Sequence, residues 1–536
     1  MPKSDTPSFV CELPLVLSSA DERIMAVRFD VARQAYNACL SETLRRLDLM
    51  RESKEYQAAR RIRVPKSEKG FPAAKARAAA FRAVNERLGF REYDLHAWAA
   101  EHIKHEWLGE HLDINTVQKL ATRAFKAAQQ YAFGKHGRPR FKGHNQLDSI
   151  EGKSNSAGIR WRDDHVEWEE LNLPASIDPK DEVIAHGLKS RVKYVRLVRR
   201  KLNGTPRYYA QLVCEGLPYQ KEKNTLGQGV VGLDLGPSTI AVVAPDAEVA
   251  FLEVFCGELR SRQKTIRRLQ RQIDRQRRAA NPNNYNPNGM AKKGAKVWRK
   301  SARQRKTGAK LAELHRKQAA HRKALHGRMV NRTLRLGNVI KLEKVSYRSF
   351  QRNFGKSVNF RAPGTFVREL KRKAVSAGAQ VDEFPTRPTR LSQMCHGCGS
   401  IERKPLAQRW HICECGVSAQ RDLYSAFLAS CVEGERLDAG RAKLAWPGVD
   451  PLLQAALSRI EQPASGGRLP ASFGLRAGRS QSRSPVIAGA NAVEAQVVVP
   501  FVSLCDGTGE LEKDSGTSRT PRLARVPHFA RAGRLA

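Results

Sequence analysis

Four of the ten cysteines fall between residues 395 and 415, in the segments CHGCG and CECG. They form a Cys-x2-Cys pair followed by a Cys-x-Cys pair: Cys395, Cys398, Cys413 and Cys415. Four thiolates so spaced bind zinc tetrahedrally, and Gly397, Gly399 and Gly416 permit the tight turns around it. The pattern therefore predicts a structural zinc knuckle. Because the second pair is one residue shorter than the first, His396 or His411 remains an alternative ligand.

The other cysteines are scattered along the chain, which is typical of small buried side chains in a reducing compartment. They are Cys11, Cys39, Cys214, Cys256, Cys431 and Cys505. No segment approaches the roughly 18 apolar residues of a membrane span. The apolar run at residues 9–20 is interrupted by Glu12 and Pro14, unlike a signal peptide. We therefore expect a cytoplasmic, nucleoid-associated protein of the prokaryotic type without a membrane partner.

Three carboxylates stand in apolar surroundings. Asp234 interrupts the buried-strand pattern VVGLDLG, Glu343 ends the run NVIKLE, and Asp422 precedes an amphipathic helical pattern. An unpaired buried carboxylate is costly, so a bound cation, a helix N-cap or a buried arginine has to offset the charge of Asp234. Carboxylates on separate elements can converge on two divalent ions, which activate a water for attack on a phosphodiester. Mg²⁺ or Mn²⁺ suits such oxygen ligands, whereas zinc suits the thiolates.

The chain is strongly basic, with 95 Lys and Arg against 53 Asp and Glu and a net charge of +42. Such a field favours a polyanionic partner and predicts binding to nucleic acid. The loop GKHGRPRFKG carries Arg138, Arg140 and Lys142 beside Phe141, a combination that can hold phosphates and stack a base.

Periodicity predicts an α+β chain of several domains. A short strand precedes a helix that begins with Ser19 as N-cap and Glu22 in a capping box, and helical sequence continues to about residue 135. Alternation around Asn203-Gly204 predicts a β-hairpin in a basic sheet or barrel. The apolar periodicity and the many basic residues of segment 257–330 predict a basic helical hairpin. The Gly-, Ser-, Pro- and Arg-rich chain after residue 433 predicts a mostly disordered tail, with a possible short strand at 497–499.

Taken in order, GLDLGPST, IKLEKVS and CHGCG to CECGVSAQRDLYSAF resemble the split RuvC nuclease of the TnpB family, which insertion sequences encode, and of the related compact type V CRISPR effectors. The N-terminal strand, ARQAYNACL and GRPRFKG also resemble stretches of this family, so the resemblance covers residues 8–432. It implies an RNase H-like core with an inserted zinc knuckle. It also implies Asp234, Glu343 and Asp422 as the metal-binding carboxylates, with Arg421 near a phosphate.

The resemblance further implies a guide RNA and a target DNA as partners, with the target read by RNA pairing beside a short flanking motif. The implied domains are the N-terminal strand of a β-barrel wedge domain (1–20), a helical recognition lobe (21–135), the β-barrel (136–226), the RuvC-like domain (227–390) with its basic hairpin (257–330), the knuckle (391–417), the last RuvC motif and helix (418–433), and the tail (434–536).

The chain departs from the family pattern at two places. Leu391-Ser392 stands where Thr-Ser is frequent, and Gln420, Arg421, Asp422, Leu423 and Tyr424 stand where Asp-Arg-Asp-x-Asn is frequent. The leading hypothesis is an RNA-guided DNA endonuclease of transposon or CRISPR origin. The alternatives are an RNA-guided repressor that binds without cutting and a transposase that joins strands.

Overall fold

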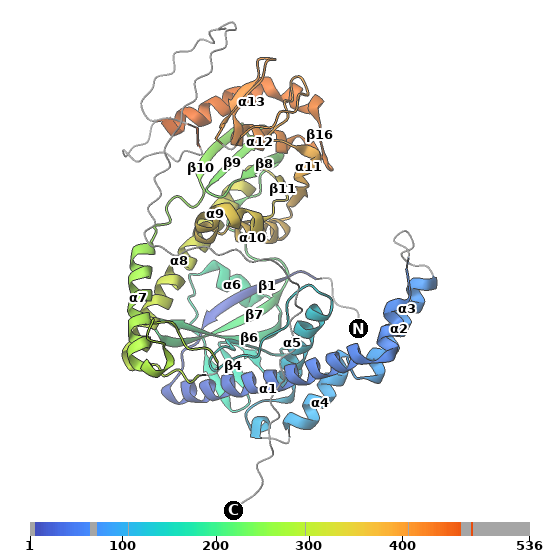
Figure 1. Ribbon diagram of the computed structural model, residues 1–536, viewed down its shortest axis with the longest axis vertical. Helices are drawn as coiled ribbons and strands as arrows, with labels where there is room; N and C mark the ends of the chain where they lie inside the picture. Colours follow the sequence, from blue (N-terminus) through green and yellow to red (C-terminus); the bar gives the residue numbers. More distant parts are fainter. Residues whose placement is uncertain are drawn as a thin grey trace, which may run out of the picture. The chain divides into compact units, whose positions relative to one another are not determined.

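The computed structural model describes residues 6–64, 72–104, 107–294, 296–405, 407–461 and 473–474. It is a mixed α/β chain built on several sheets and hydrophobic cores (Figure 1). Within these ranges no helix is long and apolar enough to cross a membrane. The predicted strand at 497–499 lies outside the described residues.

The N-terminal part contains a four-stranded antiparallel sheet in the order β1-β7-β6-β2. Its strands are β1 (Ser8–Pro14), β2 (Ser149–Glu151), β6 (Val192–Leu202) and β7 (Thr205–Glu215). β6 and β7 form the hairpin predicted around Asn203-Gly204, where both residues have the positive φ that such a turn requires.

A second, three-stranded sheet runs in the order β3-β4-β5. Its strands are β3 (Arg160–Arg162), β4 (His165–Trp168) and β5 (Leu171–Pro174). A single bridge from Leu15 to Ala175 connects the end of β1 to this sheet. Within the described residues the two sheets do not join into one continuous ladder, and the β-barrel stays a prediction.

Helices pack on these sheets around one shared core. They are α1 (Ser19–Glu52), α2 (Lys54–Arg61), α3 (Pro72–Arg87), α4 (Glu92–Lys104), α5 (Ile114–Ala132) and α6 (Glu182–Lys189), with the 3-10 turn η1 (Trp107–Glu110). A further 3-10 turn, η2 (Glu222–Asn224), follows β7 in the chain and contacts α8 (Ala302–Leu334). The capping box of α1 lies one residue earlier than predicted: Ser18 is the N-cap and Asp21 closes the box. Ser18 and Asp21 have the same three-residue spacing as Ser19 and Glu22, so the sequence alone did not distinguish them.

A five-stranded sheet forms the centre of the C-terminal half, in the order β10-β9-β8-β11-β12. Its strands are β8 (Val230–Leu235), β9 (Thr239–Ala244), β10 (Val249–Val254), β11 (Val339–Glu343) and β12 (Gln380–Phe384). The first three strands in sequence pair antiparallel as a meander. β11 then pairs parallel to β8, and β12 pairs parallel to β11.

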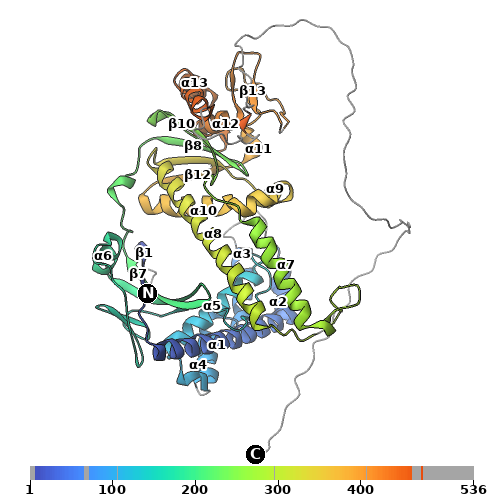
Figure 2. The same cartoon turned by 90° about the vertical axis from the view of Figure 1, so that its left-hand side faces the viewer.

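Each face of this sheet is covered by its own helices and core. One core contains Val231, Leu233 and Leu235 of β8 together with residues of α8 and α10, and the other contains residues of α12 and α13. The helices of the C-terminal half are α7 (Gln263–Ala280), α8 (Ala302–Leu334), α9 (Tyr347–Arg361), α10 (Pro363–Ala377), α11 (Thr386–Thr389), α12 (Arg421–Ser430) and α13 (Ala439–Glu461), with the 3-10 turns η3 (Pro245–Ala247) and η4 (Pro282–Asn284). Figure 2 shows α7 and α8 side by side, as the predicted basic hairpin requires.

The prediction of a mostly disordered tail from residue 434 is wrong for residues 434–461. A small hairpin of β15 (Val432–Glu433) and β16 (Arg436–Leu437) follows α12, and the long helix α13 comes next. α13 buries Ala442, Val449 and Leu453 against the second face of the sheet and contacts β10. Apart from residues 473–474, the remainder of the predicted tail lies outside the described residues.

Candidate metal sites and nucleic-acid interface

The four predicted zinc ligands converge. The Sγ atoms of Cys395 and Cys415 are 3.5 Å apart, those of Cys398 and Cys413 are 3.4 Å apart, and all four lie within 4.8 Å of one another. Tetrahedral zinc with Zn–S bonds of about 2.3 Å places its sulfurs about 3.8 Å apart, so this donor set fits the ion. Gly399 and Gly416 have φ of +76° and +91°, as the turns behind the two pairs require.

Neither candidate histidine belongs to this sulfur cluster. His396 Nδ1 lies 2.8 Å from the hydroxyl of Tyr424, and His411 Nδ1 lies 2.8 Å from Lys404 Nζ. Both histidines are buried, and burial lowers the pKa of each imidazole, to about 4 for His411. The short hairpin of β13 (Trp410–Ile412) and β14 (Ser418–Gln420) carries the second cysteine pair and leads directly into α12.

Strand register brings two of the three predicted carboxylates together. Leu342 of β11 pairs with Leu233 of β8 in a parallel ladder, so Glu343 and Asp234 follow as neighbours at the carboxyl ends of adjacent strands. Adjacent strands lie about 4.8 Å apart. Because side chains alternate along a strand, Asp234 lies on the face opposite the core residues Leu233 and Leu235. This is the face that α12 covers.

α12 brings the third carboxylate to the same place. A Cβ added to Gly232 would lie 1.9 Å from the carbonyl oxygen of Ala426, so the glycine allows the backbones of α12 and β8 to approach closely. The side chain of Gln420 caps the helix by accepting a hydrogen bond from the backbone N–H of Leu423 at 2.8 Å. Asp422 therefore sits in the first helical turn, above the end of β8 that carries Asp234.

All three carboxyl groups have raised pKa values, and burial is the largest cause for each. The pKa of Asp234 is raised well above its usual value by burial and then by the charges of Asp422 and Glu343. Burial raises the pKa of Glu343 to about 7. Burial also raises the pKa of Asp422, against the opposing attraction of Arg409 and Arg421. None of the three forms an ion pair with a residue in the described ranges, so the site has uncompensated negative charge available for a cation.

Several neighbours of this carboxylate site were not predicted. Thr239 Oγ1 donates a long hydrogen bond of 3.4 Å to Asp422, and Arg409 attracts two of the carboxylates. A groove beside Glu343 is lined by Thr386, Arg387, Arg390, Ser392 and Gln393. Ser392 and Gln393 also line a second groove, together with Arg403, Lys404, Pro405 and Arg421. Only the basic character of segment 387–409 was visible in the sequence.

Arg421 is largely buried. Its Nη1 donates hydrogen bonds of 3.0 Å to the carbonyl oxygens of Pro405 and Gln408, which ties the start of α12 to the knuckle segment. The guanidinium also lines the second groove. Its predicted contact with a phosphate stays a prediction.

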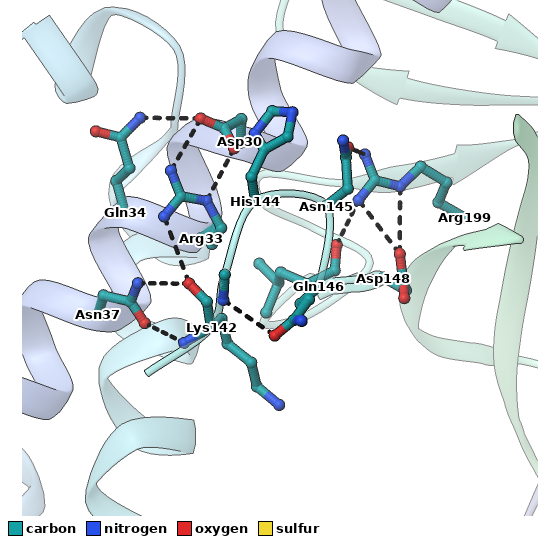
Figure 3. Close-up of polar contacts among 12 residues, drawn as sticks. Asp30, Arg33, Gln34, Asn37, Lys142, His144, Asn145, Gln146, Asp148 and Arg199 are labelled. Atoms are coloured by element: carbon teal, nitrogen blue, oxygen red, sulfur yellow. Dashed lines mark hydrogen bonds and ion pairs between the residues drawn. The ribbon is translucent and has the colours of Figure 1, made fainter. Parts of the chain in front are cut away.

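The basic loop at 134–143 is held to α1 by its backbone (Figure 3). Asn37 donates to the carbonyl oxygen of Lys142 at 2.9 Å and accepts from its N–H at 2.8 Å, while the lysine side chain extends away from these contacts. Arg140 and Phe141 are exposed, whereas Arg138 pairs with Asp48 at 3.2 Å. The loop thus presents Arg140, Phe141 and Lys142 outward, and their binding to nucleic acid stays a prediction.

Together these features define a multidomain mixed α/β protein with a four-cysteine cluster that fits a zinc ion, followed in the chain by α12 and one of three clustered acidic side chains. Residues 364–428, from α10 through most of α12, match the family model described as Cas12f1-like, TNB domain. The match supports the resemblance of this segment to the compact type V effectors and TnpB proteins.

Two solved structures are similar to the chain at low identity. The Cas12f1–sgRNA–target DNA complex is 12% identical, covers 79% of this chain and 98% of its own, and superposes with a TM-score of 0.40. A CRISPR-Cas12f ternary complex has the same identity and coverages with a TM-score of 0.23. Both scores are low, so the likeness over the whole chain is loose. No curated protein matches the chain by sequence.

Proposed function

We propose that the protein is an RNA-guided DNA endonuclease that hydrolyses phosphodiester bonds at Asp234, Glu343 and Asp422. The observation that carries this proposal is the convergence of the three carboxylates at one end of the sheet, without a protein cation paired to them in the described ranges. The order β10-β9-β8-β11-β12, with three antiparallel strands followed by two parallel ones, supports an RNase H-like core of the RuvC type.

The donor set fits Mg²⁺ or Mn²⁺, because hard divalent ions prefer carboxylate oxygens. When bound, the two ions would supply a nucleophilic hydroxide and stabilise the charge on the cleaved phosphate. The chain's own part is to hold the three carboxylates on rigid elements. Asp234 and Glu343 are fixed by the parallel ladder of β8 and β11, and Asp422 by the first turn of α12.

The grooves next to Glu343 support a polyanionic substrate. Their lining includes Arg387, Arg390, Arg403 and Lys404, which can hold backbone phosphates on either side of the bond to be cleaved. The net charge of +42 and the TNB-domain match support a guide RNA and a target DNA as the partners. We infer that RNA pairing reads the target sequence, while the protein holds the backbone of the heteroduplex.

The proposal is tested with full-length protein purified with its copurifying RNA, which is sequenced to design a matched DNA. Wild-type protein with Mg²⁺ is expected to cleave the matched DNA, and Asp234→Ala is expected to bind it without cleaving. Binding without cleavage by the wild type would replace the proposal with an RNA-guided repressor. Strand-transfer products would replace it with a transposase, and equal cleavage by Asp234→Ala would refute the proposed site.

A further inference from the structure

Four aromatic side chains from three separate elements meet beside the zinc knuckle. His396 lies between the first two cysteines, Tyr424 and Phe427 lie on α12, and Trp446 lies on α13. The ring of His396 is 4.8 Å from that of Trp446, and Phe427 is 5.5 Å from Trp446, both measured between ring centroids. His396, Tyr424 and Phe427 are fully or almost fully buried. The cluster therefore joins the knuckle, α12 and α13 in one packed unit.

Tyr424 also makes a polar connection within this cluster. Its hydroxyl accepts a hydrogen bond from the backbone N–H of His396 at 3.0 Å and lies 2.8 Å from the Nδ1 atom of the same residue. The ring of His411 stacks on the Tyr424 ring at 4.3 Å with an interplanar angle of 22°. The first cysteine turn, through His396, and β13, through His411, thus both contact a single side chain that is two residues away from Asp422.

α13 holds this arrangement from outside the knuckle. Its residues Ala442, Val449 and Leu453 are buried on the sheet, which fixes the helix independently of the cysteines. Trp446, on the same helix, packs against His396, Tyr424 and Phe427. A rotation of the knuckle relative to α12 would therefore disturb contacts to two helices that are anchored on the sheet.

This chain has Tyr424 at the position of the last residue of the Asp-Arg-Asp-x-Asn motif, where the family that it resembles frequently has asparagine. A tyrosine there is long enough to reach the backbone of the Cys-x2-Cys turn, and an asparagine is not. Other residues of α12 already pack on the sheet, since Ala426 lies against Gly232 of β8 and Phe427 belongs to the core on this face. The hydroxyl of Tyr424 is thus available for a role that packing alone does not need.

We propose that Tyr424 is a positioning residue for Asp422, and that Trp446 holds His396 in the place where it bonds the Tyr424 hydroxyl. The zinc knuckle in this way sets the position of the first turn of α12 and the metal affinity of the carboxylate site. This inference rests on the proposed function in that Asp422 is taken to bind a divalent ion. It adds a residue that acts through its contacts with His396 and His411.

The test compares full-length Tyr424→Phe with Tyr208→Phe, which removes the hydroxyl of another buried tyrosine, in the N-terminal core. Zinc content, Mn²⁺ affinity and cleavage are measured for each. Tyr424→Phe is expected to keep a full complement of zinc but to bind Mn²⁺ at the carboxylates about tenfold more weakly, the usual size of an outer-shell effect. The Mg²⁺ concentration for half-maximal cleavage should rise by about the same factor. Tyr208→Phe should match the wild type.

Unchanged Mn²⁺ affinity in Tyr424→Phe would overturn the proposal, and so would a loss of zinc, because the hydroxyl would then serve the knuckle itself. An equal loss in Tyr208→Phe would overturn it as well, since general stability would explain the effect. Trp446→Leu, the second variant, is expected to weaken Mn²⁺ binding in the same direction. Mn²⁺ affinity is measured by binding and does not require cleavage. A wild-type protein that does not cut would therefore refute the proposed function, while the comparison of Mn²⁺ affinities would still test the role of Tyr424.

Discussion

Two buried acids of the N-terminal half and two acids at the end of the five-stranded sheet have pKa values shifted in opposite directions. Glu42 on α1 is almost fully buried, yet hydrogen bonds from Arg45 and Arg46 lower its pKa below the usual value. Glu151 on β2 is also held below its usual pKa by Lys119 and Arg196, although burial alone would raise it. Asp234 and Glu343 have no such partner, and their pKa values are raised.

The difference shows which acids serve the fold. A carboxylate that stabilises the native state comes with its own cation, because burying an unpaired charge is costly. A cluster that keeps its charge uncompensated lowers stability and is retained where a ligand supplies the missing positive charge. The chain is rich enough in arginine to have paired Asp234 and Glu343, and the described structure does not do so.

The largest expected effect of this contrast is on cleavage. Glu343→Gln should reduce cleavage of the matched DNA by about a thousandfold, because it removes an anionic metal ligand from the carboxylate site. Glu42→Gln makes the same chemical change at a paired acid and should cleave at the wild-type rate. The rates are measured in single-turnover assays at saturating RNA. A large loss of cleavage in Glu42→Gln, or an unchanged rate in Glu343→Gln, would contradict the distinction between the paired and the unpaired acids.

A similar contrast separates the four clustered cysteines from the isolated buried ones, and it predicts a smaller loss of cleavage. Cys413→Ser removes one of four converging sulfurs and should abolish stoichiometric zinc and lower cleavage by about a hundredfold, since the knuckle leads directly into α12. Cys39→Ser changes a buried cysteine whose pKa burial raises to about 12, and it should retain zinc. Metal analysis of the purified variants and their cleavage rates check both statements. Full cleavage without zinc would show that Asp422 does not depend on the knuckle.

The two acids should also change stability in opposite directions. In metal-free protein at pH 8, Glu42→Gln is expected to lower the free energy of unfolding by about 2 kcal/mol, because it weakens two ion pairs. Glu343→Gln is expected to raise it by about 3 kcal/mol, because the wild type has to ionise a carboxyl whose pKa is raised from 4.5 to about 7. Denaturant unfolding with and without Mg²⁺ measures both changes. Destabilisation by Glu343→Gln in the absence of metal would contradict the interpretation of an uncompensated site.

Residue pattern was enough to predict the elements of the site but not its register. The apolar runs around Asp234 and Glu343 predicted two buried strands, and the cysteine spacing predicted the sulfur cluster. The two acids are neighbours because Leu342 pairs with Leu233 in a parallel ladder. No local sequence pattern predicts that pairing. The ion pair of Arg138 with Asp48 was also missed, because the two residues are far apart in sequence. The predicted binding of Arg138 to nucleic acid stays a prediction.

The missed helix α13 has a different cause. Ala442, Val449 and Leu453 do lie at helical spacing, and they are buried as that spacing predicts. Pro447 and Pro451 occur within the same stretch, and proline inside a helix removes a backbone hydrogen bond and commonly ends it. Burial against the sheet and the knuckle offsets that cost here. Local propensity therefore gave the wrong answer where tertiary packing determined the structure.

The smallest expected effect is the pH dependence that distinguishes the two kinds of acid. Glu343 has to lose its proton to bind a cation, and with a pKa of about 7 it is about one tenth ionised at pH 6 and about nine tenths ionised at pH 8. Cleavage at limiting Mg²⁺ should therefore rise about tenfold between these values.

Over the same range the stability of metal-free protein should fall toward a plateau above pH 7, because the native state binds more protons than the unfolded state. Glu42 contributes no slope there, since its lowered pKa keeps it ionised throughout. Saturating Mg²⁺ should shift the cleavage profile to lower pH, because the ion competes with the proton for Glu343. A cleavage rate that does not change with pH at limiting Mg²⁺ would contradict a raised pKa for Glu343.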